Sequence, residues 1–423
     1  MIPLESGTSS VYVEYITLAL MRAGFVQEIS NTYNESVENA VIRFQMANGL
    51  TPDGIVGNNT YSALLPYLEG SRRVIASAGD SLASLARRYE VAEGVIQIAN
   101  PYIDWDNLQN EVIIIPFDFD LVPADVTYTY YLVTLILRGL VDRYPFVKSF
   151  SAGLSIMGKP IEGIVIGEGK TEVFFNATHH ANEWITTPLV LKYAEEYAYA
   201  KAFDTDISDK SAKELYDKKT LYIVPVVNPD GLDLVTGGMT DTYYLDISRQ
   251  ISGSYPAIPY PDGWKANITG TDLNLNYPAG WLKARENKYA LGFVSPAPRD
   301  FVGTSPLSAP ESRAMYNFTL DHDFALTVSY HTQGNVIYWK YLDYEPDRSR
   351  AIGEALSRVS GYELELTPSA SGYAGYKDWF ILNYNRPGYT VEVGRGNNPL
   401  PLSQFDEIYK ANLPLMTTAL DLA

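Results

Sequence analysis

The sequence of 423 residues contains no cysteine, which excludes a disulfide framework and any reaction that depends on a thiolate. Histidine is scarce as well, because the chain has only four. A zinc site in this protein would therefore have to combine histidine with carboxylate ligands. The four histidines are His179, His180, His322 and His331.

Positively charged residues are also few compared with negatively charged ones. Lys and Arg number 32 against 50 Asp and Glu, so the formal net charge is −18. Proteins that bind nucleic acid need clustered cations to contact the phosphates, and we therefore expect no nucleic-acid partner.

Long apolar runs are missing. The richest apolar stretch, 130–140, is too short to span a bilayer and contains Arg138, so we expect no membrane span. The first residues show no basic start followed by an apolar core, so no secretory signal is visible. The pattern leaves the compartment open, the cytoplasm included, and gives no indication of the oligomeric state.

The chain does contain enough apolar residues, 46%, and enough length for two or three folded domains. Residues 1–70 predict a small helical domain, because 11–23 and 36–48 are amphipathic and a cluster of Gly and Pro-Asp-Gly at 48–57 marks a tight turn. The motifs of this segment resemble, in their order, the common peptidoglycan-binding domain. They are Phe44-Gln45, Gly49-Leu50, Asp53-Gly54 and Gly57.

Residues 71–117 predict a βααβ unit. A strand is followed by a helix that Asp80 or Ser81 caps, by a second helix that Pro101 stops, and by a final strand. The motifs of this unit resemble those of a LysM domain, which implies binding to glycans that contain N-acetylglucosamine, such as peptidoglycan. They are Ala78-Gly79-Asp80-Ser81-Leu82, Ile98-Ala99-Asn100-Pro101 and Ile115-Pro116.

Residues 118–423 predict one α/β domain with a mixed sheet of about eight strands flanked by helices. After a linker at 116–123 and a helix at 126–144, apolar strands alternate with helical stretches. The predicted strands are 147–154, 161–166, 172–176, 220–227, 324–330 and 388–393, and the predicted helices are 185–203, 211–218, 309–321 and 346–360.

The stretch 177–184, Ala-Thr-His-His-Ala-Asn-Glu-Trp, lies between a predicted strand and a predicted helix, where sites form in α/β sheets. His180 and Glu183 are three residues apart, so both can reach one cation, and His331 also ends a strand. Two histidines and one glutamate form a known catalytic zinc set that leaves the fourth position for water. Taken singly, the same residues could be a surface histidine, a helix-capping glutamate and a satisfied buried histidine.

Glu392 stands inside an apolar strand, where an unpaired carboxylate is costly to bury. It could form a salt bridge at the end of the strand, or it could be the base beside a water that zinc makes more acidic. The occurrence of Glu392 together with the two histidines and Glu183, in this order along the chain, favours the base.

The motifs together resemble the zinc carboxypeptidase (M14) family over about 120–423. They are His180-x-x-Glu183, Asn228-Pro229-Asp230-Gly231, Asp272-Leu273-Asn274, the strand-end His331, and Asp378-Trp379 leading to Glu392. The resemblance implies one zinc per chain, with His180, Glu183 and His331 as its ligands. It implies that Glu392 is the general base, which activates the water and later protonates the leaving amine. It also implies that Asp272 orients His180 and that Asn274 contacts the carboxylate end of the substrate.

Several positions depart from the digestive members of that family. Lys265 stands after Trp264, where those members have the arginine that polarises the scissile carbonyl, so Lys265 is the expected oxyanion donor without a guanidinium fork. Leu275 stands where they have the arginine that binds the terminal carboxylate of the substrate. Asn182 replaces another arginine and is a candidate substrate contact.

The family's mobile tyrosine has no counterpart at Ala370, so Tyr373 and Tyr376 are the nearby candidates. Lys377 stands where the family recognises the primed-side residue, and Arg395 is a further candidate cation. A cation at this place suits a primed residue with an extra carboxylate, and meso-diaminopimelate is such a residue.

The combination resembles the bacterial γ-D-glutamyl-meso-diaminopimelate (DL) endopeptidases of the family. It implies hydrolysis of that bond in peptidoglycan stem peptides, with the N-terminal domains bound to the glycan chains and raising the effective substrate concentration. A location in the cell wall, outside the cytoplasm or on the spore would follow. Two alternatives are a carboxypeptidase that trims peptide C-termini, which Leu275 argues against, and a non-catalytic glycan-binding protein, which the complete zinc set argues against.

Overall fold

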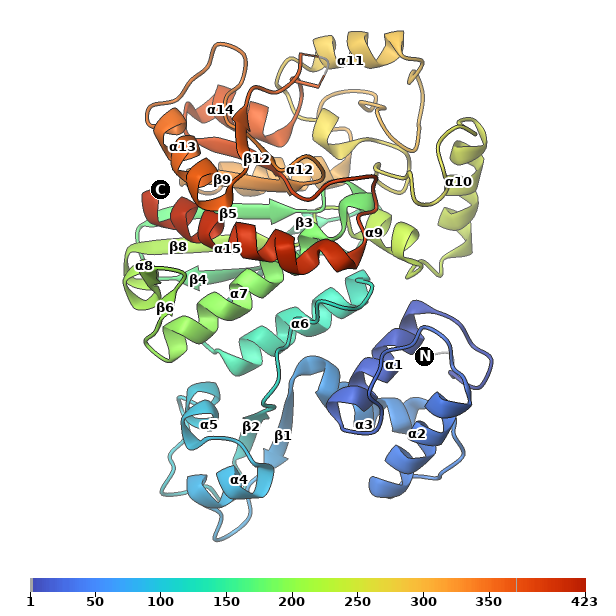
Figure 1. The fold of residues 1–423 in the computed structure, drawn as a ribbon, viewed down its shortest axis with the longest axis vertical. Coiled ribbons are helices and arrows are strands. Elements are labelled where there is room, and N and C mark those ends of the chain that lie inside the picture. Colours follow the sequence, from blue (N-terminus) through green and yellow to red (C-terminus); the bar gives the residue numbers. More distant parts are fainter. Residues whose placement is uncertain (1–2, 370) are drawn as a thin grey trace. The chain divides into compact units, whose positions relative to one another are not determined.

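The computed structural model describes residues 3–369 and 371–423 (Figure 1). Its contacts divide the chain into two compact units: one runs to Thr127 and includes Tyr131–Lys148, and the other consists of Tyr128–Tyr130 and Ser149–Ala423. The division into three domains at residues 70 and 117 stays a prediction. Among the helices of the described ranges, none combines the length and the apolarity that crossing a bilayer requires.

The first unit begins with the predicted helices, α1 (Val11–Arg22), α2 (Glu35–Ala47) and α3 (Asn58–Glu69). Asn34 caps α2, because its side chain accepts a hydrogen bond of 3.1 Å from the backbone N–H of Val37. Gln45 is buried and ties the turn before α3: its Oε1 accepts from the N–H of Gly54 and its Nε2 donates to the carbonyl of Ile55. The Phe44-Gln45 and Asp53-Gly54 motifs therefore meet in one turn.

The predicted βααβ unit is present. It consists of β1 (Ser71–Ile75), α4 (Leu82–Tyr89), α5 (Glu93–Ala99) and β2 (Val112–Pro116). The two strands pair antiparallel, with Val74 opposite Ile113. Ser81 is the N-cap of α4 and accepts a hydrogen bond from the N–H of Ser84. The order of the elements is the predicted one, while the assignment of this unit as a LysM domain stays a prediction.

A mixed sheet forms the centre of the second unit, as predicted, and has eight strands within the described residues (Figure 1). Its strand order is β11-β10-β12-β9-β5-β8-β4-β3, and the central strands β12, β9, β5 and β8 are parallel. Helix α6 (Tyr130–Arg143) precedes it in the chain. The strands are β3 (Lys148–Leu154), β4 (Pro160–Gly167), β5 (Thr171–Ala177), β8 (Lys219–Val224), β9 (Phe324–His331), β10 (Val336–Tyr338), β11 (Glu363–Glu365) and β12 (Gly388–Glu392).

Helices cover both faces of this sheet, because its central strands bury side chains on both sides. Along β5, Phe174 packs against Phe318 and Tyr376 on one face, and the next residue, Phe175, packs against Tyr193 on the other. These partners lie in α12 and α14 on the first face and in α7 on the second. The helices concerned are α7 (Thr186–Ala202), α12 (Pro310–Leu320) and α14 (Tyr376–Tyr384).

The predicted stretches match an element within a few residues, but several other elements, among them the 18-residue helix α15, were not predicted. The strand predicted at 220–227 ends at Val224, because Pro225 follows and has no N–H to donate. The predicted helices at 211–218 and 346–360 are α8 (Ala212–Lys218) and α13 (Ser349–Ser360). Unpredicted elements are β6 (Asp206–Ile207), β7 (Lys210–Ser211), α9 (Pro229–Thr236), α10 (Thr242–Gly253), α11 (Trp281–Ala290), β10, β11, α14 and α15 (Phe405–Leu422).

Candidate active site

A sharp turn follows β5 and carries the first two candidate ligands. Thr178 has a φ of 54°, in the left-handed region, where a β-branched residue is strained. Its Oγ1 shares hydrogen bonds with Oγ1 of Thr186, at 2.9 Å, and Oγ1 of Thr187, at 2.7 Å. These bonds, made to the start of α7, stabilise the turn, and the short helix η1 (Ala181–Glu183) completes it.

The Asn-Pro-Asp-Gly motif fixes the backbone next to this turn. Asn228 caps α9, because its Oδ1 accepts a hydrogen bond of 3.0 Å from the N–H of Gly231. Its Nδ2 donates to the carbonyls of His179, at 3.2 Å, and Ala266, at 3.0 Å. A Cβ at residue 231 would lie 2.6 Å from Nδ2 of Asn228, so this position requires glycine.

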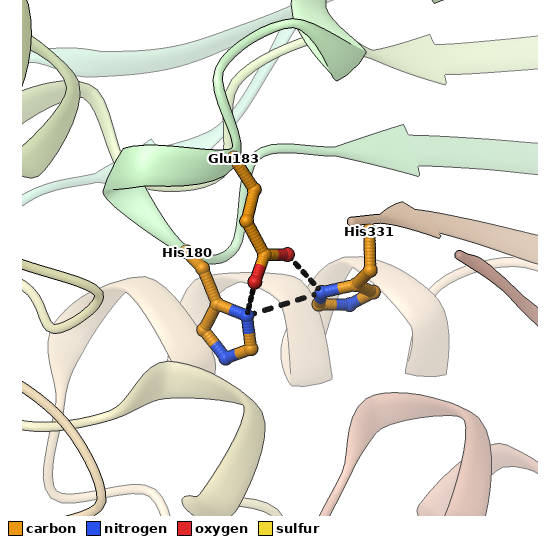
Figure 2. Close-up of side chains that lie close together, drawn as sticks. All are labelled: His180, Glu183 and His331. Atoms are coloured by element: carbon orange, nitrogen blue, oxygen red, sulfur yellow. Dashed lines mark hydrogen bonds and ion pairs between the residues drawn. The ribbon is translucent and has the colours of Figure 1, made fainter. Parts of the chain in front are cut away.

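His180, Glu183 and His331 converge on one point (Figure 2). One oxygen of Glu183 lies 2.9 Å from Nδ1 of His180, and the other lies 2.9 Å from Nδ1 of His331. The two ring nitrogens are 3.2 Å apart. His331 ends β9, which is the parallel neighbour of β5, so two adjacent strands bring the three residues to the same edge of the sheet.

This set of donors fits a zinc ion. Nε2 of His180 lies 3.1 Å from Oδ1 of Asp272, so in a neutral ring the proton is on Nε2 and Nδ1 carries a lone pair. That lone pair faces a carboxylate oxygen of Glu183 and the ring nitrogen of His331. Such acceptors repel one another unless a proton or a metal cation lies among them. Two imidazoles and one carboxylate are also the ligands of catalytic zinc sites with one open position.

The charges of the cluster favour a cation as well. Burial lowers the pKa of His180, but Glu183 and Asp272 together outweigh burial and raise this pKa to about 9. Burial would raise the pKa values of Glu183 and Asp272, but His180 and Lys265 hold both below their usual range. The two carboxylates therefore stay ionised and attract positive charge.

Glu392 borders this cluster. It ends β12 and lies opposite His331 in the register of β12 and β9. Burial, and then repulsion by Glu183, raises the pKa of Glu392 to about 8. A carboxylate with a raised pKa beside a group of metal-binding side chains is suited to accepting and returning a proton.

A pocket of about 210 Å³ opens at the cluster. Its walls include His180, Asp272 and Glu392, together with several of the residues predicted to contact the substrate. These are Lys265, Asn274, Leu275 and Lys377. Residues that are spread along the sequence from His180 to Glu392 therefore share one cavity.

The two predicted lysines of the pocket both have carboxylate partners. Nζ of Lys265 donates to Oε1 of Glu183 at 2.6 Å. Nζ of Lys377 donates to Oδ1 of Asp378 at 2.6 Å and to the carbonyl of Lys340 at 2.9 Å, and the Lys377 and Asp378 side chains are each 4% exposed. The charge of Lys377 is therefore neutralised by its neighbour.

Other predicted contacts lie outside the lining of this pocket. Asn182 is buried and its Nδ2 donates to the carbonyl of Asp262 at 2.9 Å. Tyr376 is fully buried, with its hydroxyl 2.9 Å from Oγ1 of Thr319, so it is part of the core rather than a mobile residue.

Tyr373 and Arg395 border separate cavities. Tyr373 lines a neighbouring cavity of about 170 Å³, which shares Asp378 with the first pocket. Arg395 lines a cavity of about 450 Å³ between the ends of α13 and α15, together with Tyr362 and Glu407. Ala370 lies outside the described residues.

The pocket wall also contains residues that sequence reasoning missed: Lys288, Arg299 and Asp300. They belong to the long segment between β8 and α12, which has no motif at these positions. No local pattern marks these three positions as pocket residues.

Comparison with known proteins agrees with this geometry. Residues 133–414 match the zinc carboxypeptidase family (Peptidase_M14), and residues 12–64 match a peptidoglycan binding domain. Gamma-D-glutamyl-L-diamino acid endopeptidase 1 of Lysinibacillus sphaericus is 42% identical over 300 residues, which cover 71% of this chain and 74% of that protein. The uncharacterized protein YqgT of Bacillus subtilis (strain 168) is 37% identical over 287 residues, 67% of this chain and 74% of its own.

The fold is also that of solved carboxypeptidase-like structures. The crystal structure of thrombin activatable fibrinolysis inhibitor superimposes with a TM-score of 0.54 at 19% identity, over 71% of this chain and 75% of that one. By its match over most of the sequence and by the placement of its histidines and carboxylates, the chain belongs to the zinc carboxypeptidase (M14) family of zinc metallopeptidases and carries a peptidoglycan-binding domain.

Proposed function

We propose that this enzyme hydrolyses the bond between γ-linked D-glutamate and meso-diaminopimelate in peptidoglycan stem peptides. The observation that carries the proposal is that Glu392 lies beside the cluster of His180, Glu183 and His331, and that His180 and Glu392 line one pocket. The peptidoglycan-binding domain and the relative named for γ-D-glutamyl-L-diamino acid endopeptidase activity support this choice of substrate.

The zinc, one ion per chain, would be held by Nδ1 of His180, by the carboxylate of Glu183 and by Nδ1 of His331. When bound there, zinc supplies Lewis acidity toward the attacking water and toward the scissile carbonyl. Asp272 fixes the ring orientation and the tautomer of His180 through its contact with Nε2.

The reaction forms a bond from a water oxygen to the carbonyl carbon and breaks the bond from that carbon to the nitrogen of diaminopimelate. Glu392 accepts the proton of the water and returns it to the departing amine. Lys265 lines the pocket beside Glu183, where its ammonium group stabilises the negative charge that develops on the carbonyl oxygen. Asn274, in the same wall, contributes an amide to the substrate's carboxylate end.

The first unit would keep the enzyme on its polymer. In this proposal the domain at 12–64 and the LysM-like unit at 71–117 bind peptidoglycan glycan chains, which places the protein in the cell wall or on the spore. Holding the catalytic unit near its substrate raises the effective concentration of stem peptides.

Hydrolysis of a stem tetrapeptide, L-Ala–γ-D-Glu–meso-diaminopimelate–D-Ala, tests the proposal, with products identified by mass. Cleavage into L-Ala–D-Glu and diaminopimelate–D-Ala is expected. Release of D-Ala alone would identify an ordinary carboxypeptidase, and an intact peptide would contradict any peptidase role on this substrate.

Glu392→Gln provides the control for mechanism. We expect it to retain zinc and to lose activity roughly 10²–10⁴-fold, because the amide cannot accept the proton of the water. A variant that keeps about half of the wild-type rate would contradict the role of Glu392 as the base.

A further inference from the structure

The cation that replaces the family's missing arginine at residue 275 can be located in the pocket. We propose that Arg299 binds a carboxylate of the stem peptide and so determines which peptides this enzyme accepts. The proposal rests on the proposed function and names a specificity residue for it.

Asp300 holds Arg299 in a defined position. Nε of Arg299 donates to Oδ2 of Asp300 at 2.6 Å, and Oδ1 of the same carboxylate accepts from Nζ of Lys288 at 2.5 Å. The backbone N–H of Asp300 donates to Oδ2 of Asp272 at 3.1 Å. We call Lys288, Arg299 and Asp300 the clamp. The other oxygen of Asp272 contacts His180, so the clamp is connected through Asp272 to the metal-binding cluster.

Arg299 keeps donors and charge free for a ligand. Within 3–369 and 371–423, its two terminal nitrogens have no hydrogen-bond partner, and its side chain is 43% exposed. Lys288 and Asp300 are 11% and 12% exposed, so they form the buried base of the clamp. The Asp300 carboxylate is shared by Lys288 and Arg299, so the three side chains together carry a net charge of +1. A guanidinium held at Nε, with both terminal nitrogens open, is arranged for bidentate binding of a carboxylate.

The clamp lies on the side of the pocket where Leu275 stands. Leu275 packs against Trp281 and Ala284 of α11, and Lys288 is one turn further along the same helix. Helix α11 therefore brings Lys288, and with it Arg299, to the place from which a positive charge is missing. Leu275, Lys288 and Arg299 line the same cavity.

The other cations of the described pocket wall are already engaged. Lys377 pairs with Asp378, and Lys265 pairs with Glu183. Lys288 is held by Asp300. With Lys265 assigned to the carbonyl oxygen at the metal-binding cluster, Arg299 is the described lining cation whose terminal nitrogens remain open to a substrate carboxylate.

A stem peptide offers two carboxylates close to the scissile bond. One is the α-carboxylate of the γ-linked D-glutamate, and the other is the side-chain carboxylate of diaminopimelate. The test compares kcat/KM on three tetrapeptides: the unmodified one, one with D-isoglutamine in place of D-glutamate, and one with lysine in place of diaminopimelate. Wild type, Arg299→Gln and Arg299→Lys are measured on each.

We expect Arg299→Gln to lower kcat/KM on the unmodified peptide roughly 10–100-fold, because charge-assisted hydrogen bonds are lost. On the peptide that lacks the carboxylate bound by Arg299, the same substitution changes kcat/KM by less than about 3-fold, and that peptide identifies which carboxylate is bound. Arg299→Lys should recover part of the loss, because it keeps the charge without the fork.

Arg313→Gln is the matched control, because Arg313 is exposed on α12 and does not line the pocket. Zinc content and thermal stability are measured for every variant. An equal loss of kcat/KM on all three peptides, or no loss on any, would overturn the assignment of Arg299. A wild-type enzyme inactive on all three would refute the proposed function itself, and this assignment with it.

Discussion

At the scale of single residues, the surroundings of each histidine decide its chemistry. His179 and His180 are adjacent in sequence, but Nε2 of His179 lies 3.0 Å from the hydroxyl of Tyr277, inside the core. His322 stacks on Phe324 at the far end of β9. Only His180 and His331, among the four histidines, present a ring nitrogen to Glu183.

His331→Ala tests the ligand assignment. We expect the variant to lose its zinc, to roughly a tenth of an ion per chain after dialysis against a weak chelator, because two ligands hold the ion far less tightly than three. Metal analysis of the purified protein provides the measurement. His322→Ala is the control and should keep one zinc per chain; a stoichiometric zinc in His331→Ala would show that His331 is not a ligand.

At the scale of elements, one buried amide holds three segments together. Asn228 joins the N-terminus of α9 to the backbone before His180 and to the loop at Ala266. The Asn228 side chain is fully buried. If it were removed, the groups that it binds would have no water to replace its hydrogen bonds.

Asn228→Ala should lower the free energy of unfolding of the second unit by roughly 2–4 kcal/mol, because a helix cap is lost and two carbonyls lose their donor. Chemical denaturation followed by tryptophan fluorescence measures it. Ser211→Ala is the control: Ser211 caps α8 by accepting from Glu214 at 3.3 Å and is partly exposed, so about 0.5–1 kcal/mol is expected. Equal effects of the two substitutions would refute the special role of Asn228.

At the scale of the whole molecule, a buried carboxyl makes stability depend on pH. Glu311 is fully buried and accepts hydrogen bonds of 3.1 Å from the N–H of Ile156 and from Nδ2 of Asn267. Burial raises the pKa of Glu311 to about 7, and the nearby Asp230 adds to this. The folded protein therefore binds this proton more tightly than the unfolded chain does. The contribution of Glu311 is complete below the unfolded pKa and is lost as the pH rises through about 7.

Glu311→Gln should flatten this dependence. Between about pH 5 and pH 8 the wild type loses on the order of 3 kcal/mol of unfolding free energy through this group, and the uncharged amide loses none. Denaturation curves at both pH values give the difference. Glu354→Gln, on the exposed surface of α13, should follow the wild type. Parallel pH profiles for wild type and Glu311→Gln would contradict the prediction.

The sequence by itself determined the central strands, several of the helices and the choice of His180, Glu183 and His331 as the residues that meet. Apolar runs such as β5 and β9 show their strand character locally, because burial on both faces makes each run continuous. His180 and Glu183 were recognisable because a turn three residues long sets their separation, and His331 because it ends a buried strand. The short strands β10 and β11 were missed, because three residues carry too little periodicity to be distinguished from a loop.

Only the tertiary structure decided which cations and aromatic rings line the pocket. From the sequence, Lys377 was expected to offer a free positive charge to the substrate. In the structure the side chains of Lys377 and Asp378 are both buried and neutralise each other. Tyr376 is buried in the core, and Arg299 stands in the pocket instead of an arginine at Leu275. The reason is physical: a side chain's direction and its ion-pair partner depend on segments distant in sequence, here α11 and the loop at Asp300, and no local pattern records them.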